Sequence, residues 1–306
     1  MKSYIIKKLF AFPFILIGVS LVVFIAIRSL PGDPARLMAG NQATPEAVQD
    51  MRVRLGLEQP LPVQYIKFVE GAVQGDFGHS LKSKQPVLSE ISERLPYTLI
   101  LALLAYIVAI VVGVPAGMLG AVYQHRAIDQ IVMILAITGA SVANFWLALL
   151  AMNYFSVELH WLPLLGATSW KSYILPTLTL AIFPMAVVAR MTRSGVIDVL
   201  SADYIRTAKA KGLSPVRIYW LHAFRNALVP IVTIIALNFG SLIGGAVVTE
   251  SLFNWPGIGR LLVDSVRYRD YPVIEGVTLV AVSGVVLMNL LGEVVIGFLN
   301  PKIRFN

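Results

Sequence analysis

Six long apolar segments, separated by shorter charged stretches, constrain this chain more than any other feature of its sequence. A helix needs roughly 17–25 predominantly apolar residues to cross about 30 Å of hydrocarbon. The six segments approach that length, and they lie at Leu9–Ile27, Tyr97–Val122, Ile131–Phe155, Tyr173–Ala189, Ala227–Val248 and Val277–Leu299. The sequence therefore predicts an all-α integral membrane protein built as a bundle of six transmembrane helices.

The composition supports a lipid-facing surface. Of the 306 residues, 57% are hydrophobic and 14% are charged, whereas ordinary soluble domains have roughly 45–50% and about 25%. The first apolar segment follows Lys2, Lys7 and Lys8, as a signal peptide would. It is longer than a usual signal core and no small-x-small cleavage site follows it, so we expect a retained helix.

The distribution of positive charge predicts the orientation. With both termini in the cytoplasm, the inner segments carry 13 Lys and Arg residues, and the two short outer loops, Ser156–Ser172 and Thr249–Gly276, carry 4. The other 8 lie in the long outer segment Arg28–Pro96, where 8 acidic residues match them and the loop is too long for the rule to apply. Cytoplasmic loops are usually enriched in Lys and Arg, so this arrangement is favoured. The net charge of +8 is then explained by contact with anionic membrane lipid, and no nucleic-acid partner is expected.

Two loops are longer than simple connections require. The outer insertion, residues 29–96, contains two short helical patterns: Thr44 is suited to cap a helix that starts at Pro45 and ends near Gly56, and Pro62 opens a second. Both patterns are too short and too charged to cross a bilayer. We therefore expect a small helical insertion that lies on the outer face.

The inner loop, residues 190–226, predicts a helix, a glycine turn and a second helix. Ser201 is a suitable N-cap and Gly212 a suitable stop, and Ser214 with Pro215 can start the next helix. Ala208 and Gly212 are four residues apart, which predicts a shallow spot on one face of the first helix. It would be bordered by the basic residues Arg206, Lys209 and Lys211. Such a helix fits a groove on an acidic partner, or it rests on anionic headgroups as an interfacial helix.

The inner loop also carries a family resemblance. Its segment 203–214, followed by His222 and the run 225–230, resembles the cytoplasmic coupling loop of permeases in the dipeptide/oligopeptide/nickel family of ABC importers. Further matches, in order along the chain, are Leu30–Pro34, Gly75–Gly78, and Phe253–Arg260 running on to Arg269–Pro272. Among relatives, glutathione-import and dipeptide-import permeases are the most similar. The wider importer class has the pattern E-A-A-x-x-x-G; here Arg206, Thr207 and Ala208 precede Gly212, and the glutamate is absent.

The resemblance implies a partnership. It makes residues 1–306 a single permease domain of the bacterial inner membrane that pairs with a second, different permease, with two cytoplasmic ATPases and with an extracytoplasmic substrate-binding protein. The helix Ser201–Lys211 would couple ATPase closure to transport. The ATPase-coupling residues implied are Tyr204, Arg206, Thr207, Ala208, Lys209, Lys211 and Gly212. Since the chain has no G-x-x-x-x-G-K-[ST] phosphate loop, ATP and magnesium are expected on the partner ATPases, and no catalytic residue or cofactor is expected here.

Polar residues inside the apolar segments are candidates for the transport pathway. Those predicted to line it are Asn144, Asn238, Ser241 and Asn289. The alternative is a hydrogen bond across helices, which contributes roughly 0.6–2 kcal/mol. At the outer face, residues typical of turns shape two loops, and the resemblance implies that they form a gate or contact the binding protein; these are Trp255, Pro256, Gly257 and Asp270.

Other functions fit the sequence less well. An ion-coupled carrier usually places ionisable groups at mid-membrane and often has internal repeats, and neither is visible. The chain has no G-x-S-x-G or H-E-x-x-H motif for an intramembrane enzyme. It has no cysteine and four widely separated histidines, so no metal site is expected. Within the family, the sequence leaves dipeptides, longer peptides, glutathione and nickel open as substrates.

Overall fold

The computed structural model describes residues 2–29, 33–39 and 43–299. Within these ranges the regular elements are helices, with one isolated β-bridge between His79 and Pro86. In chain order the elements are α1 (Lys2–Ser29), α2 (Pro34–Ala39), α3 (Pro45–Arg54), α4 (Leu61–Val73), α5 (Val87–Val122), α6 (Ala127–Ser141), α7 (Asn144–Ala151), the π-helix η1 (Met152–Glu158), the 3₁₀ helix η2 (Trp170–Tyr173), α8 (Ile174–Leu200), α9 (Asp203–Ala210), α10 (Pro215–Arg217), the π-helix η3 (Ile218–Phe224), α11 (Arg225–Phe239), α12 (Ser241–Leu252), α13 (Ile258–Tyr268) and α14 (Tyr271–Leu299).

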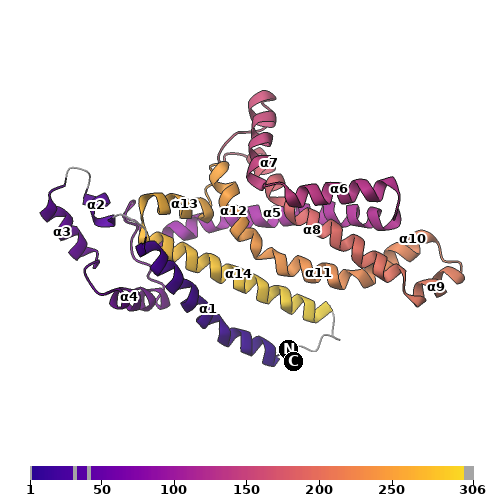
Figure 1. The fold of residues 1–306 in the computed structure, drawn as a ribbon, viewed down its shortest axis with the longest axis horizontal. Helices are drawn as coiled ribbons and strands as arrows, with labels where there is room; N and C mark the ends of the chain where they lie inside the picture. Colours follow the sequence, from indigo (N-terminus) through magenta and orange to yellow (C-terminus); the bar gives the residue numbers. More distant parts are fainter. Residues whose placement is uncertain (1, 30–32, 40–42, 300–306) are drawn as a thin grey trace.

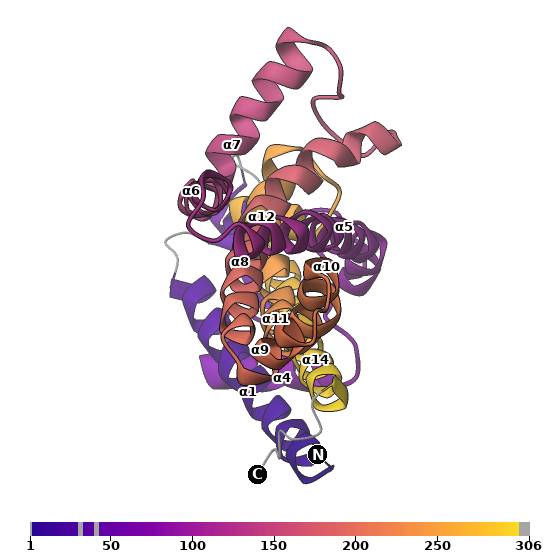
Figure 2. The ribbon, with the colours of Figure 1, turned by 90° about the vertical axis from the view of Figure 1, so that its right-hand side faces the viewer.

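The helices are arranged lengthwise around α5 and α8 (Figure 1). α2, α3, α4 and α13 lie at one end of the bundle, and α9 and α10 lie at the other. α5, α8 and α14 run from the first end to the second, and α1 runs in the opposite direction beside α14. Viewed at right angles, α7 projects away from the bundle (Figure 2).

The predicted all-α membrane architecture is confirmed in its main features. In the described ranges, four helices are long and apolar enough to cross a membrane: Ala11–Ser29, Val87–Val122, Trp170–Leu200 and Tyr271–Val294. The pair Ala127–Ser141 and Asn144–Glu158, bent by 101°, counts as a fifth candidate if it forms one broken span. The chain thus carries four or five candidate spans by length and composition.

Two of the predicted spans are not single helices. The segment Ile131–Phe155 is broken because Val142 and Ala143 adopt extended backbone between α6 and α7. The segment Ala227–Val248 is divided between α11 and α12, which meet at Gly240. A run of apolar residues indicates that a segment can cross the membrane, but it does not show whether the segment is one continuous helix. Neither Val142 nor Ala143 is a residue that normally ends a helix, so the sequence contains no local sign of the break.

Among the described residues, α5 and α8 make the most extensive contact between two helices. A side-chain carbon on Gly117 would lie 2.3 Å from the carbonyl oxygen of Ala189, and one on Gly113 would lie 2.8 Å from that of Met185. These two glycines are one helical turn apart, so they present a smooth stripe to α8. In lipid, where no hydrophobic effect pulls helices together, such small residues allow the backbone approach that gains dispersion energy.

The outer insertion has the predicted helices. α3 starts at Pro45, and the Thr44 hydroxyl accepts a hydrogen bond from the Ala47 N–H at 3.3 Å. A backbone hydrogen bond and the Thr44 hydroxyl hold the pKa of the Glu46 carboxyl below its usual range, as suits a charge at the helix start. α4 begins one residue before Pro62. The short α2 was not predicted, although Asp33, whose carboxylate accepts from the Ala35 N–H, precedes Pro34 at its start.

Replacing Gly117 by Ala is expected to destabilise the bundle by about 1–3 kcal/mol, because the new methyl group overlaps the α8 backbone. The matched control is Gly244→Ala, since a side-chain carbon at Gly244 meets no atom within 4 Å. Thermal unfolding of the two purified variants in detergent, followed by size-exclusion chromatography, measures the difference. Equal melting temperatures would contradict the packing role of Gly117.

Candidate functional site

The inner loop contains the predicted helix, glycine turn and second helix. α9 ends at Ala210, Gly212 has the left-handed φ of +75°, and α10 starts at Pro215. The predicted N-cap at Ser201 is wrong. α8 continues past the predicted span end at Ala189 to Leu200, so Ser201 terminates that helix, and its hydroxyl donates to the Asp198 carbonyl at 2.7 Å. α9 therefore starts at Asp203.

α9 has a buried face and an exposed face. Ile205 and Ala208 are 0% and 7% exposed and pack on Ile218. The predicted shallow spot at Ala208 is therefore wrong, because that side chain points into the protein. The other residues predicted for ATPase coupling are exposed: Tyr204, Arg206, Thr207, Lys209, Lys211 and Gly212. The helical repeat places Arg206, Thr207 and Ala210 opposite the buried face.

A hydrogen bond connects α9 to the start of α11. The Asn226 side-chain amide donates to the Tyr204 hydroxyl at 2.9 Å and to the His222 carbonyl at 2.8 Å. Asn226 lies in the sequence run that resembles the family, but sequence reasoning gave it no role. Leu200, the last residue of α8, packs against the same cluster as Ile205. Through this packing and the Asn226 bond, α9 is attached to both the helix before it and the helix after it.

An ion pair fixes the turn between α5 and α6 to α8 at the same end of the bundle. The Arg193 guanidinium binds both carboxylate oxygens of Asp129, with Nη2 to Oδ2 at 2.8 Å. The His125 N–H also donates to Oδ2, at 3.0 Å. An ion pair with two hydrogen bonds fixes the relative orientation of the two side chains as well as the distance between them. It was missed because the two residues are far apart in sequence.

At the opposite end, a buried carboxylate organises the loop after α12. Glu250 is 0% exposed. Its Oε1 accepts from the Thr98 hydroxyl at 2.6 Å, and its Oε2 accepts from the N–H groups of Gly259 and Arg260 at 2.8 and 3.1 Å. A side-chain carbon on Gly257 would lie 2.3 Å from this carboxylate. Glycine at 257 is therefore required for the loop to pass over Glu250.

The neighbouring residues predicted for the outer face are largely buried. Trp255 is 0% exposed and lies between the rings of Tyr97 and Tyr173. Asp270 is 2% exposed, and its carboxylate accepts from the Ser80 hydroxyl at 2.5 Å and from the Leu81 N–H at 3.0 Å. Asp270 thus joins the outer insertion to the start of α14. These residues can shape the outer loops, but Trp255 and Asp270 offer little surface to a docking protein.

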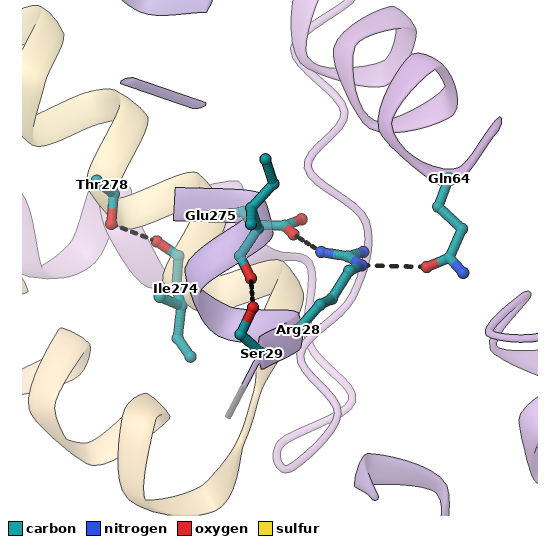
Figure 3. A network of polar contacts seen from close by, with 7 residues as sticks. Arg28, Ser29, Gln64, Ile274, Glu275 and Thr278 are labelled. Carbon is teal, nitrogen blue, oxygen red and sulfur yellow. Dashed lines mark hydrogen bonds and ion pairs between the residues drawn. The ribbon is translucent and has the colours of Figure 1, made fainter. Parts of the chain in front are cut away.

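A third carboxylate attaches the insertion to two helices (Figure 3). Arg28, at the end of α1, donates from Nη1 to Glu275 of α14 at 2.5 Å and from Nε to Gln64 of α4 at 3.1 Å. Its guanidinium also lies 3.4 Å from the centre of the Phe24 ring. Sequence reasoning missed Glu250, Glu275 and their partners, because each is a single charged residue at the edge of an apolar run.

The backbone positions of three of the predicted pathway residues, Asn238, Ser241 and Asn289, lie near one another in the structure. Asn289 of α14 has its side-chain oxygen 2.9 Å from where a side-chain carbon on Gly240 would stand, and Asn238 and Ser241 flank Gly240. The side chains of Asn238 and Ser241 lie outside the described part of the structure. Asn144 lies on another element, α7, which packs on α8 and α12. In the described residues, the Asn289 oxygen is buried without a hydrogen-bond partner.

Comparison with known families agrees with this arrangement. Residues 113–305 match the family described as binding-protein-dependent transport system inner membrane component, and residues 1–102 match its N-terminal region. The chain is 47% identical over 305 residues, covering 100% of both chains, to the glutathione transport system permease protein GsiC of Escherichia coli strain K12. It is 46% identical over the same length to the protein of that name from Shigella flexneri serotype 5b.

Two solved structures share the fold. An inward-facing structure of the MetNI methionine ABC transporter matches with a TM-score of 0.59 and 17% identity, covering 69% of this chain and 96% of that one. An amino acid ABC transporter crystallised with histidines matches with a TM-score of 0.54 and 16% identity, covering 70% and 94%. The family match and the full-length relatives confirm the resemblance that the inner loop and three other stretches of the sequence carry.

Replacing Glu250 by Gln is expected to destabilise the protein by about 1–3 kcal/mol. Both oxygens of the Glu250 carboxylate accept hydrogen bonds. In the Gln variant the NH₂ group replaces one of these oxygens, so it faces a hydrogen-bond donor and that bond is lost. The control is Asp264→Asn, which removes only the half-exposed pair with Arg260 and is expected to cost no more than about 1 kcal/mol. Thermal unfolding and protease cleavage in the 253–260 loop provide the measurement. An unchanged melting temperature and cleavage rate in Glu250→Gln would refute the organising role.

Proposed function

This chain belongs to the family of binding-protein-dependent transport system inner membrane components, and we propose that it imports short peptides of the glutathione type. It is a multi-pass permease of an ABC importer in the bacterial inner membrane. The full-length identity of 47% to a glutathione transport permease is the observation that carries the substrate proposal. Dipeptides and longer peptides are the nearest alternatives, and nickel is the third.

The proposed topology has six membrane crossings, with both termini in the cytoplasm. The crossings are α1, α5, the bent α6–α7–η1 segment, α8, the divided α11–α12 segment, and α14. The opposite directions of α1 and α14 support it, because the start of α1 and the end of α14 both lie away from the insertion, on the side toward α9 (Figure 1). The insertion at residues 29–96 then lies outside, and the loop at residues 190–226 lies inside.

We assign ATP hydrolysis to partner subunits. The chain has no phosphate-binding loop of the G-x-x-x-x-G-K-[ST] type. Two cytoplasmic ATPases that hold ATP and magnesium, a second permease and an extracytoplasmic binding protein complete the proposed assembly. In that assembly α9 is the coupling helix, and it presents Arg206, Thr207 and Ala210 to a groove on an ATPase.

The coupling route follows the contacts of α9. A displacement of α9 is transmitted to α8 through the chain itself and to α11 through the Asn226–Tyr204 hydrogen bond. α8 is fixed to α5 by the glycine stripe and to α6 by the Arg193–Asp129 pair. The inner ends of four helices therefore move together when α9 moves. The opposite ends are held by the carboxylates of Glu250, Asp270 and Glu275.

The proposed pathway passes the junction of α11 and α12. Asn238, Ser241 and Asn289 are assigned to it, because amide and hydroxyl groups can replace water around the backbone of a passing peptide. Asn144 stays a weaker candidate on the projecting α7. At the outer face, Trp255, Pro256, Gly257 and Asp270 are assigned to shaping the loops that meet the binding protein, rather than to direct contact.

The absence of cysteine allows a clean test of topology and coupling. Thr207→Cys places a thiol on the exposed face of α9, and Lys67→Cys places a matched thiol on the exposed face of α4. A membrane-impermeant maleimide is expected to label Lys67→Cys in intact cells and Thr207→Cys only in inside-out vesicles. A thiol cross-linker is expected to capture an ATPase subunit from Thr207→Cys alone.

Either of two results would count against this assignment. Labelling of Thr207→Cys in intact cells would reverse the topology. Capture of lipid but no ATPase, with the transporter assembled, would make α9 an interfacial helix.

Substrate choice is tested by uptake in cells that lack other glutathione and peptide importers and express this chain with its companion subunits. Radiolabelled glutathione is expected to accumulate in an ATP-dependent manner. Unlabelled glutathione is expected to compete, and Ni²⁺ is not. Competition by dipeptides alone would reassign the substrate within the family and would leave the permease function unaffected.

A further inference from the structure

An apolar groove lies between α1, α4, α5 and α14, and no residue of the coupling loop or of the proposed pathway lines it. Its volume is about 560 Å³, within the roughly 300–1,000 Å³ typical of sites for small molecules. One wall is the α14 segment from Leu279 to Met288, and the facing wall is the α1 segment from Pro13 to Ser20. α4 contributes Phe68, Val69, Ala72 and Val73.

The side chains that line the groove favour a hydrocarbon ligand. No charged residue lines the groove, and its hydroxyl groups are those of Ser20, Thr98 and Ser283. Ser20 donates to the Ile17 carbonyl at 2.9 Å and also bonds the Tyr65 hydroxyl. Thr98 donates to Glu250 and accepts from the Ile258 N–H. With Ser20 and Thr98 already engaged, the groove offers little to a peptide or to ordered water, which needs two to four polar partners.

The groove is bordered by exposed apolar residues of two candidate membrane spans. Ile17 and Leu287 line it, lie inside candidate spans, and are 48% and 50% exposed. The same helices continue with exposed apolar residues such as Phe14 and Leu291, at 75% and 57%. The groove is thus continuous with the surface that spanning helices present to lipid.

The length of the groove favours a lipid chain over a protein helix as its occupant. Leu279 and Met288 are nine residues apart, which corresponds to roughly 14 Å along α14. That is about half of the 30 Å hydrocarbon core, or the depth of one leaflet. At the outer end α4 covers the groove, held there by Tyr65 and Gln64. A spanning helix of a neighbouring subunit would require a groove that continues through both leaflets.

We propose that this groove binds one acyl chain of a phospholipid from the outer leaflet. An unfilled apolar space would forfeit dispersion contacts on every wall, and hydrocarbon is the solvent at its mouth. The bound chain contacts Thr98 and Ile258, and so it supports from below the loop that Glu250 organises. The proposal rests on membrane insertion and, for the choice of leaflet, on the proposed orientation, and it is independent of the transported substrate.

The test uses the assembled transporter in bilayer nanodiscs that contain a phospholipid with a photoactivatable group on its acyl chain. Cross-links are expected on the groove walls of α1, α4 and α14. Two variants fill the groove from different walls, Ala72→Phe and Ala281→Phe, and each is expected to lower these cross-links about tenfold, a change worth about 1.4 kcal/mol. Val111→Phe is the matched control, because Val111 is 64% exposed on α5 and does not line the groove.

Native mass spectrometry provides a second readout that does not depend on the cross-linker. Wild type and Val111→Phe are expected to retain one phospholipid that both filled variants lose, with subunit composition unchanged in all four proteins. Retention of the lipid and its cross-links in a correctly assembled filled variant would overturn the proposal. So would capture of the second permease, in place of lipid, by a photoreactive residue at Leu16. Neither result would count against the transport proposal.

Discussion

The close packing of α5 on α8 is the contact on which most of the structure depends. Helices in lipid gain little from the hydrophobic effect, so their association relies on backbone approach and on polar contacts. Gly113 and Gly117 provide that approach. Each of the two helices then carries a polar group that fixes a further element: Arg193 of α8 holds α6 through Asp129, and Thr98 of α5 holds the loop after α12 through Glu250. The central pair therefore determines where both ends of the bundle are placed.

The end with the insertion and the helix α9 use polar groups in opposite ways. At the end with the insertion, Glu250, Asp270 and Glu275 are buried and bonded to donors from other elements. A buried carboxylate is costly unless it is paired, so each one enforces a single arrangement of the segments around it. At the other end, Asp129 is likewise buried and paired with Arg193. The charged groups of α9 itself are exposed, and this helix is fixed by apolar packing of Ile205 and by one neutral hydrogen bond. An exposed charge is free to meet a partner protein.

The sequence predicted those features of the fold that depend on bilayer thickness and on the residues that start and end helices. Run length identified the long helices, and Thr44, Gly212 and Pro215 marked helix boundaries that the structure contains. It could not predict features that arise from distant contacts. The break at Val142 has no local signal, and the burial of Ala208 follows from Ile218 lying beneath it. Glu250 looked like an ordinary charge at the end of an apolar run, because its donors come from residues 98, 259 and 260.

The coupling role proposed for α9 places a requirement on how the helices between the two ends respond. A continuous helix such as α8 transmits displacement along its whole length, because every turn is hydrogen-bonded to the next. The α11–α12 segment differs, since it is divided at Gly240, a residue with no side chain to brace the junction. α11 is joined to α9 at one end, whereas α12 ends in the carboxylate that fixes the outer loop. A displacement of α9 with the outer loop held still must therefore be absorbed between them, at the junction where Asn289 approaches Gly240.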